Sequence, residues 1–284
     1  MEASPDAREI SGVQMNAPPV AATFLLLVVI LVFMGLIVLE KRRPLRSFGR
    51  EKVKTAFSTN TSAFVINNVI MSVFSASSLL VVAGNYAGHG LLAAAPDGPA
   101  KWALSFILFD FAVYAWHYAG HRVEGLWRFH KVHHSDRTFQ VTTGLRFHVF
   151  DQFLEVVVKC LCTVAFGVEA HVVIVCEILR MFFVLFHHAN ITFPGERLLS
   201  YVIITPSLHR AHHSTLRSQH DSNFGVVLAL WDMIFGTRKE LTPKSIGLNL
   251  IQADNLVQLF SLAFVTEERL AQVVHLLPRK RRDR

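Results

Sequence analysis

The chain has 284 residues, of which 52% are apolar and 17% charged, and its formal net charge is +7. This length allows one good-sized core or one membrane domain with an attached cap, and the long apolar runs favour the membrane domain. The three cysteines (Cys160, Cys162 and Cys176) lack CxxC spacing, which argues against a disulfide framework and against a zinc ribbon.

The first apolar run predicts a transmembrane helix. Residues 1–19 are mostly polar or small and are expected to be loose, whereas residues 21–39 carry no charge and are long enough to cross a bilayer. The segment before this run contains Glu2, Asp6 and Glu9 instead of a basic region. We therefore expect a retained helix and not a signal peptide.

Basic residues follow the first apolar run and also close the chain. Seven lie between Lys41 and Lys54, and five lie between Arg279 and Arg284. The positive-inside rule places both patches at the cytoplasmic face, against anionic headgroups, although plain solvated charge explains the C-terminal tail equally well. No soluble domain is evident that would present these patches to nucleic acid, so no nucleic-acid partner is expected.

Further apolar runs predict an all-α integral membrane protein. Residues 61–84 and 100–116 predict a second and a third span, with Asn67 and Asn68 facing another helix, and residues 85–99 predict a non-cytoplasmic loop. Residues 153–186 have the length of a helical hairpin, although several charges interrupt them. We expect about four transmembrane or hairpin helices with a cytoplasmic helical cap that holds a histidine-rich dimetal site. The expected divisions are an N-terminal part (1–99), a catalytic domain (100–240) and a C-terminal cytoplasmic segment with a basic tail (241–284).

The histidines carry the strongest chemical signal. Twelve of the fifteen lie between His117 and His213, and eight of them form one HxxxH and two HxxHH motifs: His117, His121, His130, His133, His134, His209, His212 and His213. Residues three and four apart share a helical face, so such imidazoles can chelate one ion. One HxxxH motif alone is as compatible with surface histidines or a core pair. Three motifs at one membrane face are hard to explain by packing, and eight imidazoles favour two adjacent ions.

Spacing alone does not choose the metal. Imidazole suits Zn, Fe, Cu and Ni, and thiolates are absent from the motifs. Residues 101–236 contain neither the Glu-x-x-His pairs of ferritin-like di-iron sites nor the HExxH motif of zinc proteases. Thr205 followed by Pro206 predicts the start of a helix just before His209, and residues 231–236 predict a helix that ends at glycine.

Taken together, these motifs resemble the fatty acid hydroxylase/sterol desaturase superfamily, whose members are histidine-rich membrane di-iron oxygenases. The resemblance covers about residues 100–240 and lies in segments 110–117, 121–122, 126–135, 143–148, 187–191, 205–213, 221–225 and 231–237. It implies that all eight motif histidines are iron ligands. It also implies a further ligand between the two HxxHH motifs, for which we choose His188, with His187 as the alternative.

The resemblance also leaves residues outside the ligand set. His148 lies where an Arg-x-His-Pro sequence is common, but Val149 replaces the proline here, so we assign His148 to the surroundings of the ligands. Ligating imidazoles usually need a carboxylate or carbonyl partner on the other nitrogen. The candidates for that role, or for plain capping and surface roles, are Asp110, Asp221, Asn223 and Asp232. His89, His171 and His275 are expected to be structural, and His220 receives no role.

The activity implied by the resemblance is O2-dependent hydroxylation or desaturation of a membrane lipid at two Fe ions, which zinc can replace in a purified sample. The lipid remains open among fatty acyl, sterol, alkyl-glycerol and amino-lipid classes. Dinucleotide, haem-attachment and ferredoxin motifs are missing, so electrons must come from a separate cytochrome, ferredoxin or reductase at the cytoplasmic face. The rival hypotheses are a zinc-dependent membrane hydrolase and a non-catalytic metal-binding membrane protein.

Overall fold

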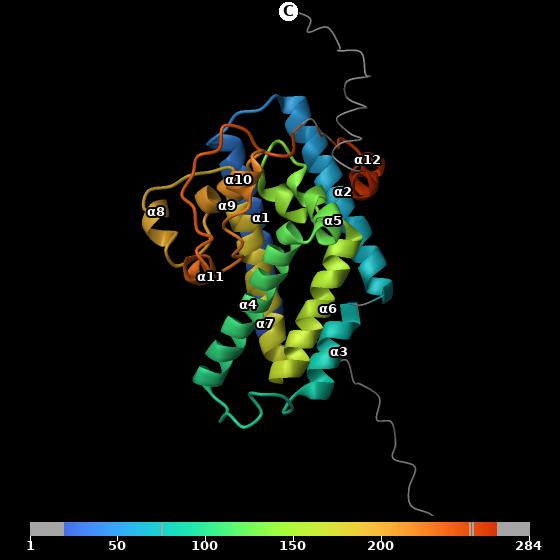
Figure 1. Ribbon diagram of the computed structural model, residues 1–284, viewed down its shortest axis with the longest axis vertical. Helices are drawn as coiled ribbons and strands as arrows, with labels where there is room; N and C mark the ends of the chain where they lie inside the picture. Colours follow the sequence, from blue (N-terminus) through green and yellow to red (C-terminus); the bar gives the residue numbers. More distant parts are fainter. Residues whose placement is uncertain (1–19, 75, 250, 252, 266–284) are drawn as a thin grey trace, which may run out of the picture.

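The structure, a computed structural model, describes residues 20–74, 76–249, 251 and 253–265, which are mostly helical (Figure 1). Within this part of the chain strands are absent, and two isolated antiparallel bridges join Ile203 to Leu228 and Ser214 to Ile246. The helical fold class is thus confirmed for the described residues. The expectations for residues 1–19, for the basic tail and for His275 lie outside them.

Six helices form the elongated part of the molecule (Figure 1). The expected second span, residues 61–84, falls on α2, which begins at Arg50 within the basic connection, and on α3, which ends at Tyr86. The expected third span also extends further, so that α4 carries the HxxxH motif in its last turns. The bounds are α1 Val20–Arg42, α2 Arg50–Phe74, α3 Ala76–Tyr86, α4 Pro99–Arg122, α6 Val149–Phe166 and α7 Ala170–His187.

Helices α6 and α7 make the expected hairpin. The turn begins at Gly167, whose φ of 71° is in the left-handed region that favours glycine. A Cβ on Gly167 would lie 1.6 Å from the carbonyl oxygen of His89, so the close approach of the α3–α4 loop also requires glycine there. Helix α1 packs against α7, and α3 and α4 pack against α6. Because these helices pack against α6 or α7, the hairpin lies at the centre of the long helices.

Short helices gather at the other end of the molecule and form a cap (Figure 1). Helix α9 begins at Pro206 after Thr205, and Gly236 adopts φ 66° after α11, as the sequence indicates. The cap elements are α5 Glu124–His134, η1 Val141–Leu145, α8 Glu196–Leu199, α9 Pro206–His212, α10 Arg217–His220, α11 Leu230–Ile234, α12 Leu256–Ser261 and η2 Leu262–Phe264.

Buried Arg146 ties the cap to the long helices. Its guanidinium donates to Asn60 Oδ1 on α2 (2.9 Å), to Ser135 Oγ after α5 (3.0 Å) and to the carbonyl of Ala253 (2.9 Å). Asp136, also buried, accepts hydrogen bonds from Asn60 and Thr143. Buried charges of this kind hold a unique arrangement because each partner is satisfied only in that arrangement.

The two asparagines of α2 differ in their surroundings. Asn67 is fully buried and donates to the carbonyl of Phe147, as expected for an amide that faces another segment. Asn68 is exposed and donates to the Phe64 carbonyl of its own helix, so the expectation was wrong for this residue. An amide can satisfy itself one turn back along its helix without needing a neighbouring helix.

By length and composition, one helix among the described residues, Ala170–His187, is apolar enough to cross a membrane. A core helix of a soluble protein can meet the same criteria. The multi-pass topology expected from the sequence therefore remains a proposal.

Candidate metal centre

Four segments bring nine buried histidines together where the long helices meet the cap. Helix α4 supplies His117 and His121, and the C-terminal end of α7 supplies His188. The HxxHH motifs lie on α5 and at α9, which explains their helical spacing. These nine are the residues chosen from the sequence as ligands, and their imidazoles separate into two groups.

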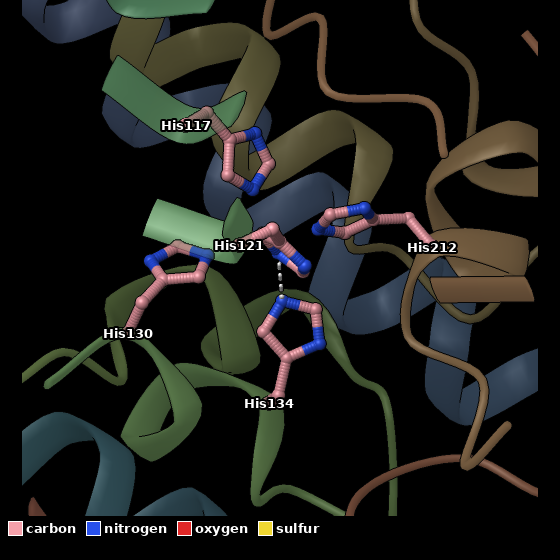
Figure 2. A group of neighbouring side chains, drawn as sticks. All are labelled: His117, His121, His130, His134 and His212. Atoms are coloured by element: carbon pink, nitrogen blue, oxygen red, sulfur yellow. Dashed lines mark hydrogen bonds between the residues drawn. The ribbon is translucent and has the colours of Figure 1, made fainter. Parts of the chain in front are cut away.

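The first group draws on three helices and comprises His117, His121, His130, His134 and His212. One ring nitrogen from each lies within 4.8 Å of those of the others, and Figure 2 shows the rings gathered in one place. The Nε2 atoms of His121 and His134 are 3.1 Å apart. The Nε2 atoms of the other three members are buried without a hydrogen-bond partner.

The second group comprises His133, His188, His209 and His213. The Nε2 atom of His188 lies 3.0 Å from that of His209, 3.1 Å from that of His133 and 3.3 Å from that of His213. The rings of His133 and His188 each use their Nδ1–H on a backbone carbonyl, so their facing Nε2 atoms are both acceptors and cannot hydrogen-bond each other. Ligands about 2.1 Å from one cation lie about 3.0–3.4 Å apart in right-angled or tetrahedral arrangements, which matches these separations.

The donor set therefore fits a cation in each group. Burial lowers the pKa of His133, His134, His209, His212 and His213 well below the ordinary 6.5, and neighbouring imidazoles lower it further. The rings are thus neutral at pH 7, as metal ligands must be. Unpartnered buried nitrogens are costly in a protein interior, so a bound cation would remove that cost.

Each HxxHH motif is divided between the two groups. His130 and His134 belong to the first group, whereas His133 belongs to the second. In the other motif His212 joins the first group, and His209 and His213 join the second. A motif therefore contributes to both sites and fixes their relative position, which is a more specific arrangement than chelation of one ion by each motif.

Most outer nitrogens of the rings have protein partners. Carboxylates accept from Nδ1 of His121 (Asp221, 3.3 Å) and of His130 (Asp151, 3.0 Å). Backbone carbonyls accept from the Nδ1 atoms of four more rings: His117 (Phe224, 2.7 Å), His133 (Arg146, 3.2 Å), His188 (Val184, 2.7 Å) and His212 (Ser222, 2.7 Å). Such bonds fix the tautomer and turn Nε2 towards the centre of the group.

Two other candidate partners from the sequence, Asp232 and Asn223, bond backbone groups and not the imidazoles. Asp232 accepts from the backbone amides of Phe224 and Gly225, and so holds the carbonyl that bonds His117. Asn223, at φ 55°, bonds the backbone at Leu208 and Lys239.

Asp110 and His148 also bond groups other than the ligands. The Asp110 carboxylate accepts from the indole of Trp231 (2.9 Å) and from the amides of Val227 and Leu228, so it positions the 226–231 segment. His148 caps α6 by accepting from the Phe150 amide.

Asp151 is the residue that sequence reasoning missed. It lies in the first turn of α6, is buried, and bonds His130 directly. The sequence offers one weak signal, an acidic residue three positions after His148 at the start of an apolar run. An acid in a first helical turn is ordinarily a favourable interaction with the helix dipole, so this signal alone did not identify a ligand partner.

The remaining histidines lie around the two groups or away from them. His187 is buried, bonds the Val226 carbonyl through Nδ1 and lies 3.9 Å from the His209 ring between centroids, but it is in neither group. His220 stacks on Trp127 and forms a third cluster with His121 and Asp221. His171 contacts Glu169 and Trp102, whereas His89 is exposed.

A small cavity of about 40 Å³ borders both groups. His117 and His130 reach it from the first group, and His133, His188 and His209 reach it from the second. The rest of its wall combines five apolar residues, Val113, Trp116, Phe147, Val184 and Val226, with four polar ones, Asp151, Glu155, Arg180 and His187. A small ligand in this cavity would therefore meet both groups.

Comparison with known proteins identifies relatives of the part of the chain that holds these groups. Residues 102–237 match the model of the fatty acid hydroxylase family. The chain is 31% identical to ornithine lipid hydroxylase OlsE of Rhizobium tropici over 49% of its length and 44% of that protein. It is 31% identical to alkylglycerol monooxygenase of Homo sapiens (50% of this chain, 31% of that one) and 32% identical to cholesterol 25-hydroxylase of Mus musculus (50% and 48%). No solved structure matches the chain significantly.

The fold and the site thus define a helical protein with a buried, two-part histidine centre. The part of the chain that holds this centre, residues 102–237, matches the fatty acid hydroxylase family. The resemblance found in the sequence is confirmed, and these relatives are lipid hydroxylases and monooxygenases, which are oxidoreductases. The matches span less than half the length of these relatives.

Proposed function

We propose that the protein is a membrane di-iron oxygenase that hydroxylates or desaturates a lipid with O2 and electrons from a separate donor. The observation that carries this proposal is the convergence of nine buried imidazoles in two adjacent groups, both of which border one cavity. The names of the relatives, which act on ornithine lipid, alkylglycerol and cholesterol, support a lipid as the substrate.

The nine histidines would hold two Fe ions, one in each group, and bound iron would supply the reaction of O2 with an unactivated C–H bond. Hydroxylation consumes one O2, two electrons and two protons, and yields an alcohol and water. The protein's residues bind the chain, orient one carbon towards both groups and exclude water. Trp116, Phe147 and Val184 orient the carbon and exclude water, because they form the apolar part of the cavity wall beside the imidazoles.

Exposed apolar side chains support a membrane location for this reaction. Leu31 on α1 is 70% exposed, Leu161 on α6 is 65% exposed and Val69 on α2 is 61% exposed. Exposed apolar surface on this scale is unfavourable in water and favourable against lipid tails. We propose that the long helices cross or enter the bilayer and that the metal centre lies at its cytoplasmic face, where the electron donor would dock.

The test is anaerobic reconstitution of the full chain with Fe(II) in detergent, followed by addition of reductant, O2 and a panel of fatty acyl, sterol, alkyl-glycerol and amino-lipid substrates. We expect two irons per chain and transfer of ¹⁸O from ¹⁸O2 into an oxidised lipid, measured by mass spectrometry. The control is His133→Ala, which removes a member of the second group and should abolish turnover.

Stable zinc binding with ester or amide cleavage in the absence of O2 would overturn the proposal and establish the hydrolase hypothesis. Metal binding without turnover of any substrate class, under every reductant tried, would instead favour a non-catalytic metal-binding protein.

A further inference from the structure

Four charged side chains meet between α6 and α7, just beyond the metal centre; we call Glu155, Lys159, Glu177 and Arg180 the charged cluster. Lys159 is 3% exposed and lies 2.9 and 3.0 Å from the two Glu177 oxygens and 3.1 Å from Glu155. Arg180 faces the same two carboxylates from α7. Ionisable residues in an apolar helical hairpin are expensive, and they commonly mark a functional site.

The cluster lies where two cavities meet. Glu155 and Arg180 line the cavity that borders both histidine groups, and they also line a second, larger cavity of about 360 Å³. The second cavity extends past Asn68 on α2 and Leu79 on α3. A lipid chain in the second cavity would therefore approach the metal centre past Glu155 and Arg180.

Arg180 is held less tightly than Lys159. Its guanidinium is 3.4 Å from Glu155 and 3.3 Å from Glu177, against 2.9–3.1 Å for the contacts of Lys159. Arg180 Nε is buried without a hydrogen bond, whereas Glu155 Oε1 lies 3.1 Å from Lys159 Nζ and 3.4 Å from the Arg180 guanidinium. One donor of the guanidinium is thus left over at the edge of both cavities, and a buried polar atom without a partner is costly unless a ligand supplies one.

We propose that Arg180 and Glu155 bind the polar headgroup of the lipid substrate, so that oxidation takes place at a carbon close to that headgroup. This inference rests on the proposed oxygenase function and narrows its substrate class. The guanidinium suits an oxygen acceptor of the headgroup, and the carboxylate suits a hydroxyl or amine donor. Lys159 and Glu177 are positioning residues, because their mutual ion pair holds the other two in place.

Helix geometry sets the distance from the headgroup to the oxidised carbon. Glu155 is one turn from Asp151, the partner of His130, and Arg180 is two turns before His188. With a rise of 1.5 Å per residue, the headgroup site is about 6–12 Å from the histidine groups. A site this close excludes attack at the far end of a long chain.

The test compares two probes that differ only in hydroxyl groups: 1-O-hexadecylglycerol and hexadecyl methyl ether. Their binding to the full metal-loaded chain is followed under argon by the fluorescence of Trp116, which lines the metal-centre cavity, with Trp116→Phe identifying its signal. The main variant, Glu155→Gln with Arg180→Gln, removes both headgroup ligands, keeps the net charge and leaves the Lys159–Glu177 pair intact. The control, Lys101→Gln, removes a charge paired with exposed Asp97 outside both cavities.

We expect the natural chain and the Lys101 variant to bind the glycerol probe at least tenfold more tightly than the ether. The double variant should reduce this preference to less than threefold. Equal binding of both probes by the natural chain would overturn the proposal, as would a double variant that weakens both probes equally, which is the result for a purely structural cluster.

The headgroup test needs neither O2 nor turnover, so it fails independently of the oxygenase proposal. Headgroup preference without turnover would overturn only the oxygenase. Turnover with ¹⁸O placed at the distal end of the chain would leave the oxygenase intact and overturn the headgroup site.

Discussion

Asp151 accepts a hydrogen bond of 3.0 Å from Nδ1 of His130, and both side chains are buried. The bond directs Nε2 of His130 towards the first group, and this second ring nitrogen has no hydrogen-bond partner. A helix of the hairpin and a helix of the cap thereby act on one ligand. Because His130 and Asp151 lie on different helices and share no sequence motif, this relationship is a property of the fold.

Replacement of Asp151 by asparagine should weaken metal binding in the first group by about 10–100-fold, because the imidazole loses its charged partner and its fixed orientation. Competition with a chelator of known affinity measures this change. Asp97→Asn is the control, since Asp97 is an exposed acid paired with Lys101. Unchanged affinity in the Asp151 variant would show that the hydrogen bond does not orient the ligand.

Adjacent histidines of one motif should affect different ions. His134→Ala removes a member of the first group and His133→Ala removes a member of the second, so each variant should retain one ion out of two. Native mass spectrometry counts the ions, and the double variant should retain none. If both single variants lost the same ion, the division of the motif between two groups would be wrong.

His188 and His187 should differ sharply although they are neighbours. His188 contributes Nε2 to the second group, whereas His187 bonds the Val226 carbonyl and lies outside both groups. We expect His188→Ala to lower metal affinity more than tenfold and His187→Ala to lower it less than threefold, as measured by metal titration. The reverse order would identify His187 as the ligand.

The metal-free chain should lose stability as the pH falls below about 6.5. The pKa of buried His133, His134, His209, His212 and His213 is well below 6.5 in the folded state, so the unfolded state binds more protons in this range. Stability therefore rises with pH up to about 6.5, by at most about 1.4 kcal/mol per pH unit for each histidine.

Denaturant titrations of the metal-free chain in detergent, at several pH values between 5 and 8, measure this dependence. Bound metal should increase the loss on acidification, because protons then also compete with the metal for the imidazoles. A flat profile in the metal-free chain would mean that these rings are solvated or protonated in the folded state.

The sequence by itself determined the kind of centre. Histidine is the only residue type in the three motifs with metal-binding chemistry, and spacings of three and four on helices bring imidazoles onto one side. The apolar runs likewise determined that long helices carry the site, and Thr205, Pro206 and Gly236 indicated helix ends that the structure contains. These are local properties, so neighbouring residues were sufficient to predict them.

Only the tertiary structure decided how the ligands divide and what supports them. Successive residues on a helix point about 100° apart, so His133 and His134 cannot face the same ion and each turns to a different partner helix. Asp151, the Phe224 carbonyl and the charged cluster reach the site through packing between distant segments. Such contacts depend on where whole helices lie, and residue spacing along the chain does not carry that information.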